Sequence, residues 1–233
     1  MKILCTIPAR GGSKSIPKKN LVNLDGKPLI AYSIIQALKS KNINRCIVTT
    51  DSEEIAKVAK KYGAEVPFIR PKKLAQDSTS DLPVFQHTLK WLAIHEKYFP
   101  DIIVHLRPTA PIRQVSDIDK AIDILIGDSN ADSLRSICAP SQSPFKMWEI
   151  RDEYLKPLIN IKGKESFNLP RQKLPTVYWQ NASIDVIRYA TIMNKNSMSG
   201  SRIIPFLMDK SFSIDIDDYL DLSLAEFIIK KFK

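Results

Sequence analysis

Residues 3–20 read ILCTIPARGGSKSIPKKN, and this stretch decides the fold. Its apolar beginning, Ile3 to Ile7, is typical of a buried strand, and the glycine-rich turn that follows carries Arg10, Lys14 and Lys19. Backbone N–H groups and fixed positive charge at the end of a strand suit a polyphosphate. Three cations crowded into one loop repel one another unless an anion joins them. The stretch therefore favours nucleotide binding over a plain strand-to-helix connection.

Strands and helices alternate beyond this loop. Pro28, at a plausible first helical position, and the apolar spacing after it predict a helix to Leu38. Asp51 stands three residues before Glu54, which predicts a capping box and a helix that ends at Gly63. Further strands are expected at 46–50, 66–69 and 102–106, and further helices at 83–95 and 116–126. Continuous apolar strands separated by amphipathic helices indicate an α/β fold with a mainly parallel sheet sandwiched by helices.

The pattern changes after about residue 138, where five prolines punctuate short strand-like pieces. We expect residues 140–180 to leave the sheet as a small excursion within one domain that spans residues 1–233, and such an arm can pair with a second copy. Alternating residues at 183–188 and 214–217 predict two more strands, and residues 220–229 predict a last helix.

Length and composition exclude several classes of protein. The 233 residues, 44% of them hydrophobic, can bury a substantial core, and no apolar run approaches the roughly 20 residues that span a bilayer. No export signal is recognisable near Lys2, and the three cysteines, without metal-ligand spacing, are expected as reduced thiols. We therefore expect a cytoplasmic protein without a membrane partner.

The formal net charge of +10 has two interpretations. One is a nucleic-acid-binding protein, which predicts tight and steeply salt-dependent binding to nucleic acid. The excess charge is spread along the chain, however, except at residues 10–27, which hold five basic residues and one acidic residue. A local cluster of this kind attracts a small polyanion as readily as it attracts DNA. We expect no nucleic-acid partner.

Asp215 and Asp217 stand two residues apart on the strand predicted at 214–217. On a strand their carboxylates project from the same face and can share one hard cation. The alternative is an exposed edge strand with solvated carboxylates. The polyphosphate expected at the first loop favours the metal site, because Mg²⁺ neutralises phosphate charge.

Seven sequence blocks, taken together and in order, resemble a known family: 7–20, Thr50-Asp51, Arg70 with Asp77-Ser78-Thr79-Ser80, 107–113, Pro170-Arg171-Gln172, Gln180-Asn181 and 213–217. Over essentially its whole length the chain resembles the acylneuraminate cytidylyltransferases, the CMP-sialic acid synthetases. The resemblance implies a Rossmann-like nucleotidyltransferase fold with a small dimerisation excursion, a homodimer and a Mg²⁺ cofactor. It also implies transfer of CMP from CTP to the anomeric hydroxyl of an acidic nine-carbon 2-keto sugar, an N-acylneuraminate or related nonulosonic acid, with release of pyrophosphate.

The resemblance also implies roles for individual residues. Arg171, Lys19 and Asp217 are the expected catalytic residues, and Asp215 with Asp217 the expected metal ligands. The expected nucleotide-binding residues are Arg10, Gly11, Gly12, Ser13, Lys14 and Asn20 of the first loop, then Arg70, Ser78, Thr79, Ser80 and Arg107. No histidine is an obvious base, and packing or solvation is expected for His87, His95 and His105.

Two positions depart from the family pattern. Arg107 replaces a glutamine that many relatives have, and Ala182 replaces a glycine. A guanidinium seeks a carboxylate or phosphate, so we expect the acceptor pocket to differ. The carboxylate of the acceptor needs a cationic partner, for which the candidates are Arg107, Arg113, Arg171 and Lys173. A cytidylyltransferase for the eight-carbon acid Kdo is the alternative enzyme, although its usual first loop reads differently.

Overall fold

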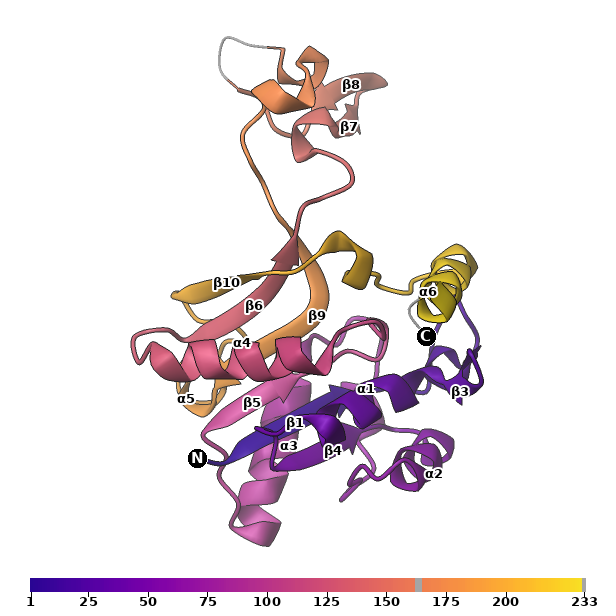
Figure 1. Cartoon of the computed structure of the whole chain (residues 1–233), viewed down its shortest axis with the longest axis vertical. Coiled ribbons are helices and arrows are strands. Elements are labelled where there is room, and N and C mark those ends of the chain that lie inside the picture. Colours follow the sequence, from indigo (N-terminus) through magenta and orange to yellow (C-terminus); the bar gives the residue numbers. More distant parts are fainter. Residues whose placement is uncertain (162–164, 232–233) are drawn as a thin grey trace.

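Six strands form one mixed sheet, in the order β10–β6–β9–β5–β1–β4 (Figure 1). The computed structural model describes residues 1–161 and 165–231. β1 lies parallel to both β4 and β5, β6 lies parallel to β10, and β9 runs antiparallel between β5 and β6. The strands are β1 (Ile3–Pro8), β4 (Arg45–Thr49), β5 (Ile102–His105), β6 (Ser133–Cys138), β9 (Trp179–Arg188) and β10 (Ile203–Leu207). The predicted α/β fold with a mainly parallel sheet is confirmed.

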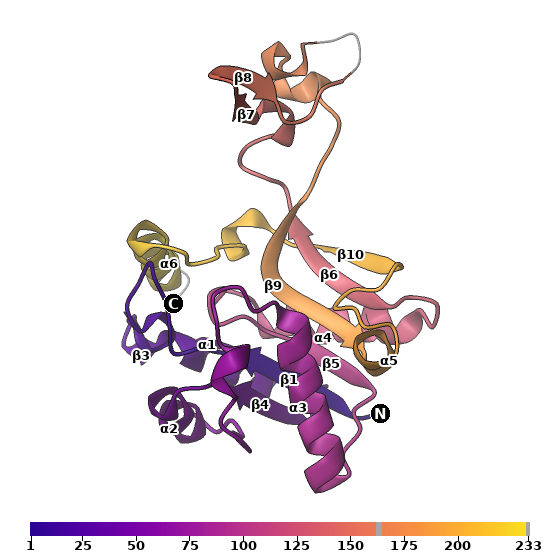
Figure 2. The same ribbon diagram turned by 180° about the vertical axis from the view of Figure 1, so that it is seen from behind.

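Helices cover both faces of the sheet because successive side chains of β1 point to opposite sides. Ile3, Cys5 and Ile7 pack under α1 (Leu29–Lys39), α2 (Glu53–Lys61) and α4 (Val115–Gly127). Leu4 packs on the other face with α3 (Asp81–Glu96) and α5 (Tyr189–Met193), which Figure 2 shows in front. The strands are therefore buried on both sides, as their continuous apolar character predicts.

A smaller apolar cluster ties the end of the chain to the first loop. Ile16, Leu24 and Leu29 pack against Ile216 and Ala225. Ala225 belongs to the last helix, α6 (Tyr219–Lys231), and Leu24 to a two-residue hairpin of β2 (Asn23–Leu24) and β3 (Lys27–Pro28). Residues about 200 positions apart in the sequence are thereby held beside each other.

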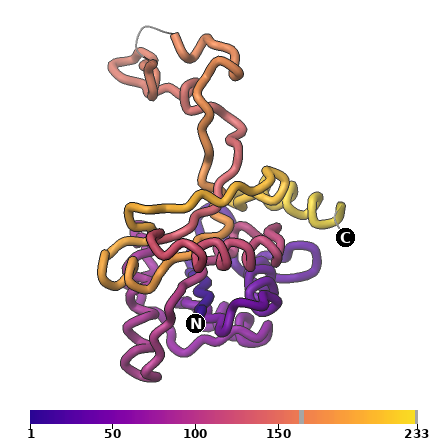
Figure 3. The backbone as a smooth tube through the Cα atoms, turned by 60° about the vertical axis from the view of Figure 1, so that its left-hand side comes forward, coloured from indigo at the N-terminus to yellow at the C-terminus, as the bar shows by residue number. Residues whose placement is uncertain are grey.

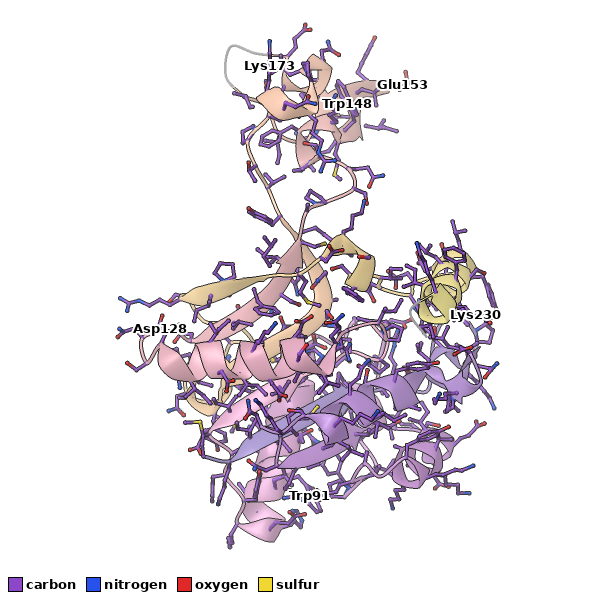
Figure 4. The ribbon with its side chains drawn as sticks, viewed as in Figure 1. Trp91, Asp128, Trp148, Glu153, Lys173 and Lys230 are labelled. Carbon is purple, nitrogen blue, oxygen red and sulfur yellow. The ribbon has the colours of Figure 1, made fainter. Side chains whose placement is uncertain are left out.

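Residues between β6 and β9 form a lobe that projects away from the sheet (Figures 1 and 3). The lobe contains the hairpin of β7 (Trp148–Arg151) and β8 (Tyr154–Pro157) and three short 3-10 helices, η3 (Pro144–Lys146), η4 (Ser166–Asn168) and η5 (Arg171–Lys173). Trp148 and Lys173 mark it in Figure 4. The remaining 3-10 helices, η1 (Lys19–Leu21), η2 (Lys72–Leu74) and η6 (Lys210–Phe212), belong to the body of the molecule.

Two predicted helix starts and two predicted strands are wrong. Pro28 is the N-cap of α1 and not its first residue, and α2 is capped by Ser52, whose Oγ accepts from the Ile55 amide, and not by Asp51. Residues 66–69 make only an isolated bridge, Thr50 to Ile69, in place of a strand. Residues 214–217 form no strand either. The Ile216 amide donates a hydrogen bond to the carbonyl of Thr109, which lies in the loop after β5.

Along the described residues, no helix combines the length and apolar character needed to cross a lipid bilayer.

Candidate active site

A pocket of about 470 Å³ lies where β1 and β5 end. Its wall comes from the loop after β1, the loop after η2, the start of α3, the end of β5 and Asp217 near the C-terminus. Ten of the residues predicted from the sequence line it: Arg10, Gly12, Ser13, Lys14, Lys19, Asn20, Arg70, Thr79, Arg107 and Asp217. The first loop and the C-terminal segment therefore meet in space, as the sequence interpretation requires.

The glycine-rich loop is fastened to the sheet by specific hydrogen bonds. The Gly11 amide donates to Asp51 Oδ1 at 2.9 Å, and Asn20 Nδ2 donates to the Arg10 carbonyl at 2.9 Å. A Cβ at Gly11 would lie 3.1 Å from Ser52 Cβ, so the loop passes close to the start of α2 only because position 11 is glycine. Gly11 and Asp51 thus shape the loop from behind and do not line the pocket.

The three loop cations already contact acceptor oxygens. Arg10 Nη1 and Lys14 Nζ each lie 2.6 Å from the carboxylate of Asp77. Lys19 Nζ donates to the Ile216 carbonyl at 2.9 Å and lies 3.3 Å from Asp217 Oδ1. Lys19 is only 12% exposed, whereas Lys14 is 83% exposed. Lys19 is therefore a largely buried charge held at the base of the site, and Lys14 is an exposed charge at its rim.

Arg70 lies beneath the pocket with only 4% of its side chain exposed. Its Nη2 is 3.8 Å from Asp51 Oδ1, and its Nε is buried without a hydrogen-bond partner among the described residues. Burial lowers the pKa of this guanidinium, an effect that the Asp51 charge opposes. Of the serine and threonine run that follows, Thr79 lines the pocket, whereas Ser78 and Ser80 do not.

The wall opposite the glycine-rich loop contains a charge network. Arg107 donates to Asp185 Oδ2 at 3.0 Å and to Asp81 Oδ2 at 3.1 Å, and Arg135 donates to Asp185 Oδ1 at 2.9 Å. Burial alone would lower the pKa of Arg107, but the two aspartates outweigh burial and raise it. Asp185 is 3% exposed, so two guanidinium groups share one buried carboxylate.

His105 packs behind this network and is fully buried. Its Nδ1 is 3.8 Å from Asp185 Oδ2 and 4.0 Å from Asp81 Oδ2, and burial, followed by the charge of Arg107, lowers its pKa well below the usual value. His105 is therefore a neutral packing residue at physiological pH. No role is predicted from the sequence for Asp77, Asp81 or Asp185, although all three take part in the charge contacts of the pocket. The only signal in the sequence was that a guanidinium at position 107 must find a carboxylate.

Asp215 and Asp217 do not share the face of a strand. Asp217 is 81% exposed and lines the pocket, while Asp215 lines a second, mainly apolar hollow with Trp179 and Leu224. Desolvation raises the pKa of Asp215, a side-chain hydrogen bond with Thr109 opposes this rise, and the nearby charge of Asp217 adds to it. The two carboxylates are close enough to interact, but the prediction that they project from the same face of a strand is wrong, because residues 214–217 form no strand.

Two of the predicted arginines lie away from the pocket wall. Arg113 is buried and donates to the Arg107 carbonyl at 2.6 Å and to Ser33 Oγ at 2.9 Å, so it holds the 107–113 loop instead of facing a ligand. Burial lowers the pKa of Arg113 to about 9. Arg171 lies in η5 of the lobe, where it donates to the Pro140 carbonyl at 2.7 Å. Neither residue lines the pocket of its own chain.

A pocket lined with cations at the carboxyl ends of parallel strands is characteristic of α/β proteins that bind anionic ligands such as nucleotides. A family model described as Cytidylyltransferase matches residues 4–165, and the chain belongs to this family of nucleotidyltransferases. The resemblance to acylneuraminate cytidylyltransferases is thereby confirmed at the level of the family.

Individual relatives match over nearly the whole chain. The CMP-N,N'-diacetyllegionaminic acid synthase of Campylobacter jejuni is 38% identical over 98% of this chain and 95% of its own length. The N-acylneuraminate cytidylyltransferase of Escherichia coli is 31% identical over 99% of this chain and 52% of its own length. A solved CMP:2-keto-3-deoxy-manno-octonic acid synthetase complexed with CTP superposes over the whole of both chains with a TM-score of 0.72 at 16% identity, which shows the shared fold.

Proposed function

We propose that this cytidylyltransferase transfers CMP from CTP to the anomeric hydroxyl of a nonulosonic acid, a nine-carbon 2-keto sugar acid. The acceptor oxygen forms a bond to the α-phosphorus of CTP while the bond to pyrophosphate breaks, and the hydroxyl proton is lost to water. The observation that carries the proposal is the convergence of Arg10, Lys14, Lys19 and Asp217 on one pocket. The relatives named for diacetyllegionaminic and acylneuraminic acids support this class of acceptor.

The loop cations and loop amides would hold the triphosphate and stabilise the charge on the departing pyrophosphate. Lys19 suits this role best, because the Ile216 carbonyl and the Asp217 carboxylate fix its ammonium group inside the site. Little covalent chemistry is required of the protein in such a displacement, since positioning and charge stabilisation supply most of the catalysis.

We further propose that Asp215 and Asp217 hold Mg²⁺. Among the described residues no group of three or more histidine, cysteine, aspartate or glutamate side chains forms a metal cluster. Magnesium commonly takes only one or two carboxylates and completes its shell with water and substrate phosphates. Asp215 Oδ1 is buried without a hydrogen-bond partner, which fits a ligand atom that is paired only when the metal is bound. The ion would supply neutralisation of phosphate charge.

Arg107 is the remaining candidate in this chain for contact with the acceptor carboxylate. Its contacts to Asp81 and Asp185 use Nη1 and Nη2, and it is 20% exposed at the pocket wall. Arg113 is committed to the 107–113 loop, and Arg171 and Lys173 lie in the lobe. A fixed guanidinium in place of a neutral amide would favour an anionic acceptor group at this position.

We propose that the lobe forms a homodimer with a second copy. Its hairpin exposes Ile150 by 79%, Tyr154 by 75%, Leu155 by 61% and Trp148 by 41%. Apolar side chains gathered on a projecting hairpin are characteristic of an interface. Pairing of this kind would also allow Arg171 to reach the pocket of the partner subunit, since Arg171 lies outside the pocket of its own chain.

We also propose a cytoplasmic location. The three cysteines are buried and form no disulfide, which is typical of proteins in a reducing compartment.

The test is release of pyrophosphate with Mg²⁺ and a panel of acids that includes N-acylneuraminic, legionaminic, pseudaminic and eight-carbon Kdo. Release should require CTP and a nine-carbon acid together. Asp217→Ala should abolish it with the circular dichroism spectrum unchanged. Asp218→Asn is the matched control, because it removes the neighbouring charge and keeps an oxygen to cap the Leu220 amide. Full activity of Asp217→Ala, or turnover only with the eight-carbon acid, would overturn the proposal.

A further inference from the structure

The carboxylate of Asp77 occupies the position where the loop cations would meet phosphate. Oδ1 lies 2.6 Å from Arg10 Nη1, and Oδ2 lies 2.6 Å from Lys14 Nζ. Each oxygen therefore engages a different cation, as two oxygens of one phosphate group would. Asp77, Arg10 and Lys14 all line the nucleotide pocket, so the ion pairs lie inside the site and not on a remote surface.

The loop that carries Asp77 is attached locally. The described backbone hydrogen bonds donated by Leu74, Ala75 and Thr79 all end on carbonyls of residues 71–76. Thr79 Oγ1 likewise contacts the Lys73 carbonyl. The ion pairs of Asp77 thus tie this loop to the glycine-rich loop across the pocket, and the tie can open without loss of a sheet hydrogen bond.

The tie is also weak enough for a ligand to break. Asp77 is 49% exposed and Lys14 83% exposed, and exposed ion pairs contribute little because water solvates both partners. Hydrogen bonds from Lys14 and then Arg10 lower the pKa of Asp77, so the carboxylate stays charged at physiological pH. A triphosphate carries several negative charges and would contact all three loop cations that line the pocket, whereas Asp77 offers one charge to two of them.

We propose that Asp77 is an internal competitor for the triphosphate: it neutralises Arg10 and Lys14 in the free enzyme and leaves them when the nucleotide enters. Asp77 therefore sets the affinity of the pocket for polyphosphate. It also makes that affinity favour highly charged ligands, since a ligand with a single charge gains little by replacing one carboxylate with another anion. The inference rests on the proposed binding of CTP in this pocket, and it does not depend on the acceptor.

The experiment measures binding of inorganic tripolyphosphate, and separately of CTP, to the full chain by isothermal titration calorimetry without acceptor. Asp77→Asn removes the charge and keeps the size of the side chain. We expect it to bind tripolyphosphate about three- to tenfold more tightly than the parent protein, from the loss of two exposed ion pairs with the competitor. Asp77→Glu retains the competing carboxylate and should bind within about twofold of the parent.

The matched control is Glu54→Gln. Glu54 pairs with Lys18 of the same loop at 2.7 Å, is comparably exposed and lies outside the pocket. Glu54→Gln should leave the affinity for tripolyphosphate unchanged. This control separates the loss of a competing carboxylate in the pocket from a general increase in positive charge. Equal or weaker binding by Asp77→Asn, or an equal gain in Glu54→Gln, would overturn the inference. Failure of transfer to every acid, with tighter binding by Asp77→Asn intact, would instead count against the proposed acceptor.

Discussion

Replacing Asp185 by asparagine should lower the free energy of unfolding by about 2–4 kcal/mol. The buried carboxylate of Asp185 receives Arg107 at 3.0 Å and Arg135 at 2.9 Å. A hydrogen bond to a charged group contributes roughly 1.5–3 kcal/mol, so loss of both would cost up to about 6 kcal/mol. The actual cost is smaller, because an amide oxygen can still accept one hydrogen bond and Arg107 retains Asp81.

Urea unfolding followed by circular dichroism measures this loss. For a domain of this size the midpoint of thermal unfolding should fall by about 5–15 °C. The exposed pair of Lys18 and Glu54 provides the control, and Glu54→Gln should change the free energy of unfolding by less than about 0.5 kcal/mol.

A double-mutant cycle tests the origin of the effect. Arg107→Gln leaves Asp185 paired with Arg135, so it should lower the free energy of unfolding by less than Asp185→Asn does. The double variant should be less destabilised than the sum of the two single variants by about 1–2 kcal/mol, because either single change already removes the ion pair between Arg107 and Asp185. Strict additivity, or a loss below about 0.5 kcal/mol in Asp185→Asn, would refute the view that this network stabilises the pocket wall.

Three further predictions concern other parts of the molecule. Ile150→Lys in the lobe should convert a dimer into a monomer in light scattering, while Phe99→Lys, a 51% exposed site on the body, should not; an unchanged mass would contradict the dimer proposal. His105 has a lowered pKa in the folded state, so the unfolded state binds more protons below about pH 6.5 and stability should fall from pH 7 to pH 5. His105→Gln should reduce this fall, and an identical pH dependence would count against the buried neutral imidazole. Gly200→Ala should lower the free energy of unfolding by about 1–3 kcal/mol, because the φ of +68° disfavours a side chain and the added Cβ would collide with Asp132. At Gly127 an added Cβ meets no atom within 4 Å, so Gly127→Ala should leave the free energy of unfolding nearly unchanged.

Most helices and strands, and the glycine-rich loop of the site, could be predicted from residues that are close together in the sequence. The periodicity of residues 29–38 and 116–126 predicted α1 and α4, because one face of each helix had to be apolar to pack on the sheet. The glycine-rich loop was recognisable because its amides and cations lie next to one another in the chain. The prediction of a strand at 214–217 was wrong because alternation of isoleucine and aspartate also fits an extended segment that buries Ile216 and partly buries Ile214 without pairing to the sheet.

Sequence by itself determined the alternation of strands and helices, the cationic loop and the family, since each depends on residues close together in the chain or on whole blocks in order. Only the tertiary structure decided which charges meet. Asp77 lies beside Arg10, and Asp185 lies between Arg107 and Arg135. Asp185 meets its two arginines because β9 inserts between β5 and β6, and Asp77 meets Arg10 because the loop after η2 lies across the pocket from the loop after β1. Electrostatic interactions depend on distance in space, and a chain that folds back on itself makes that distance independent of separation in sequence.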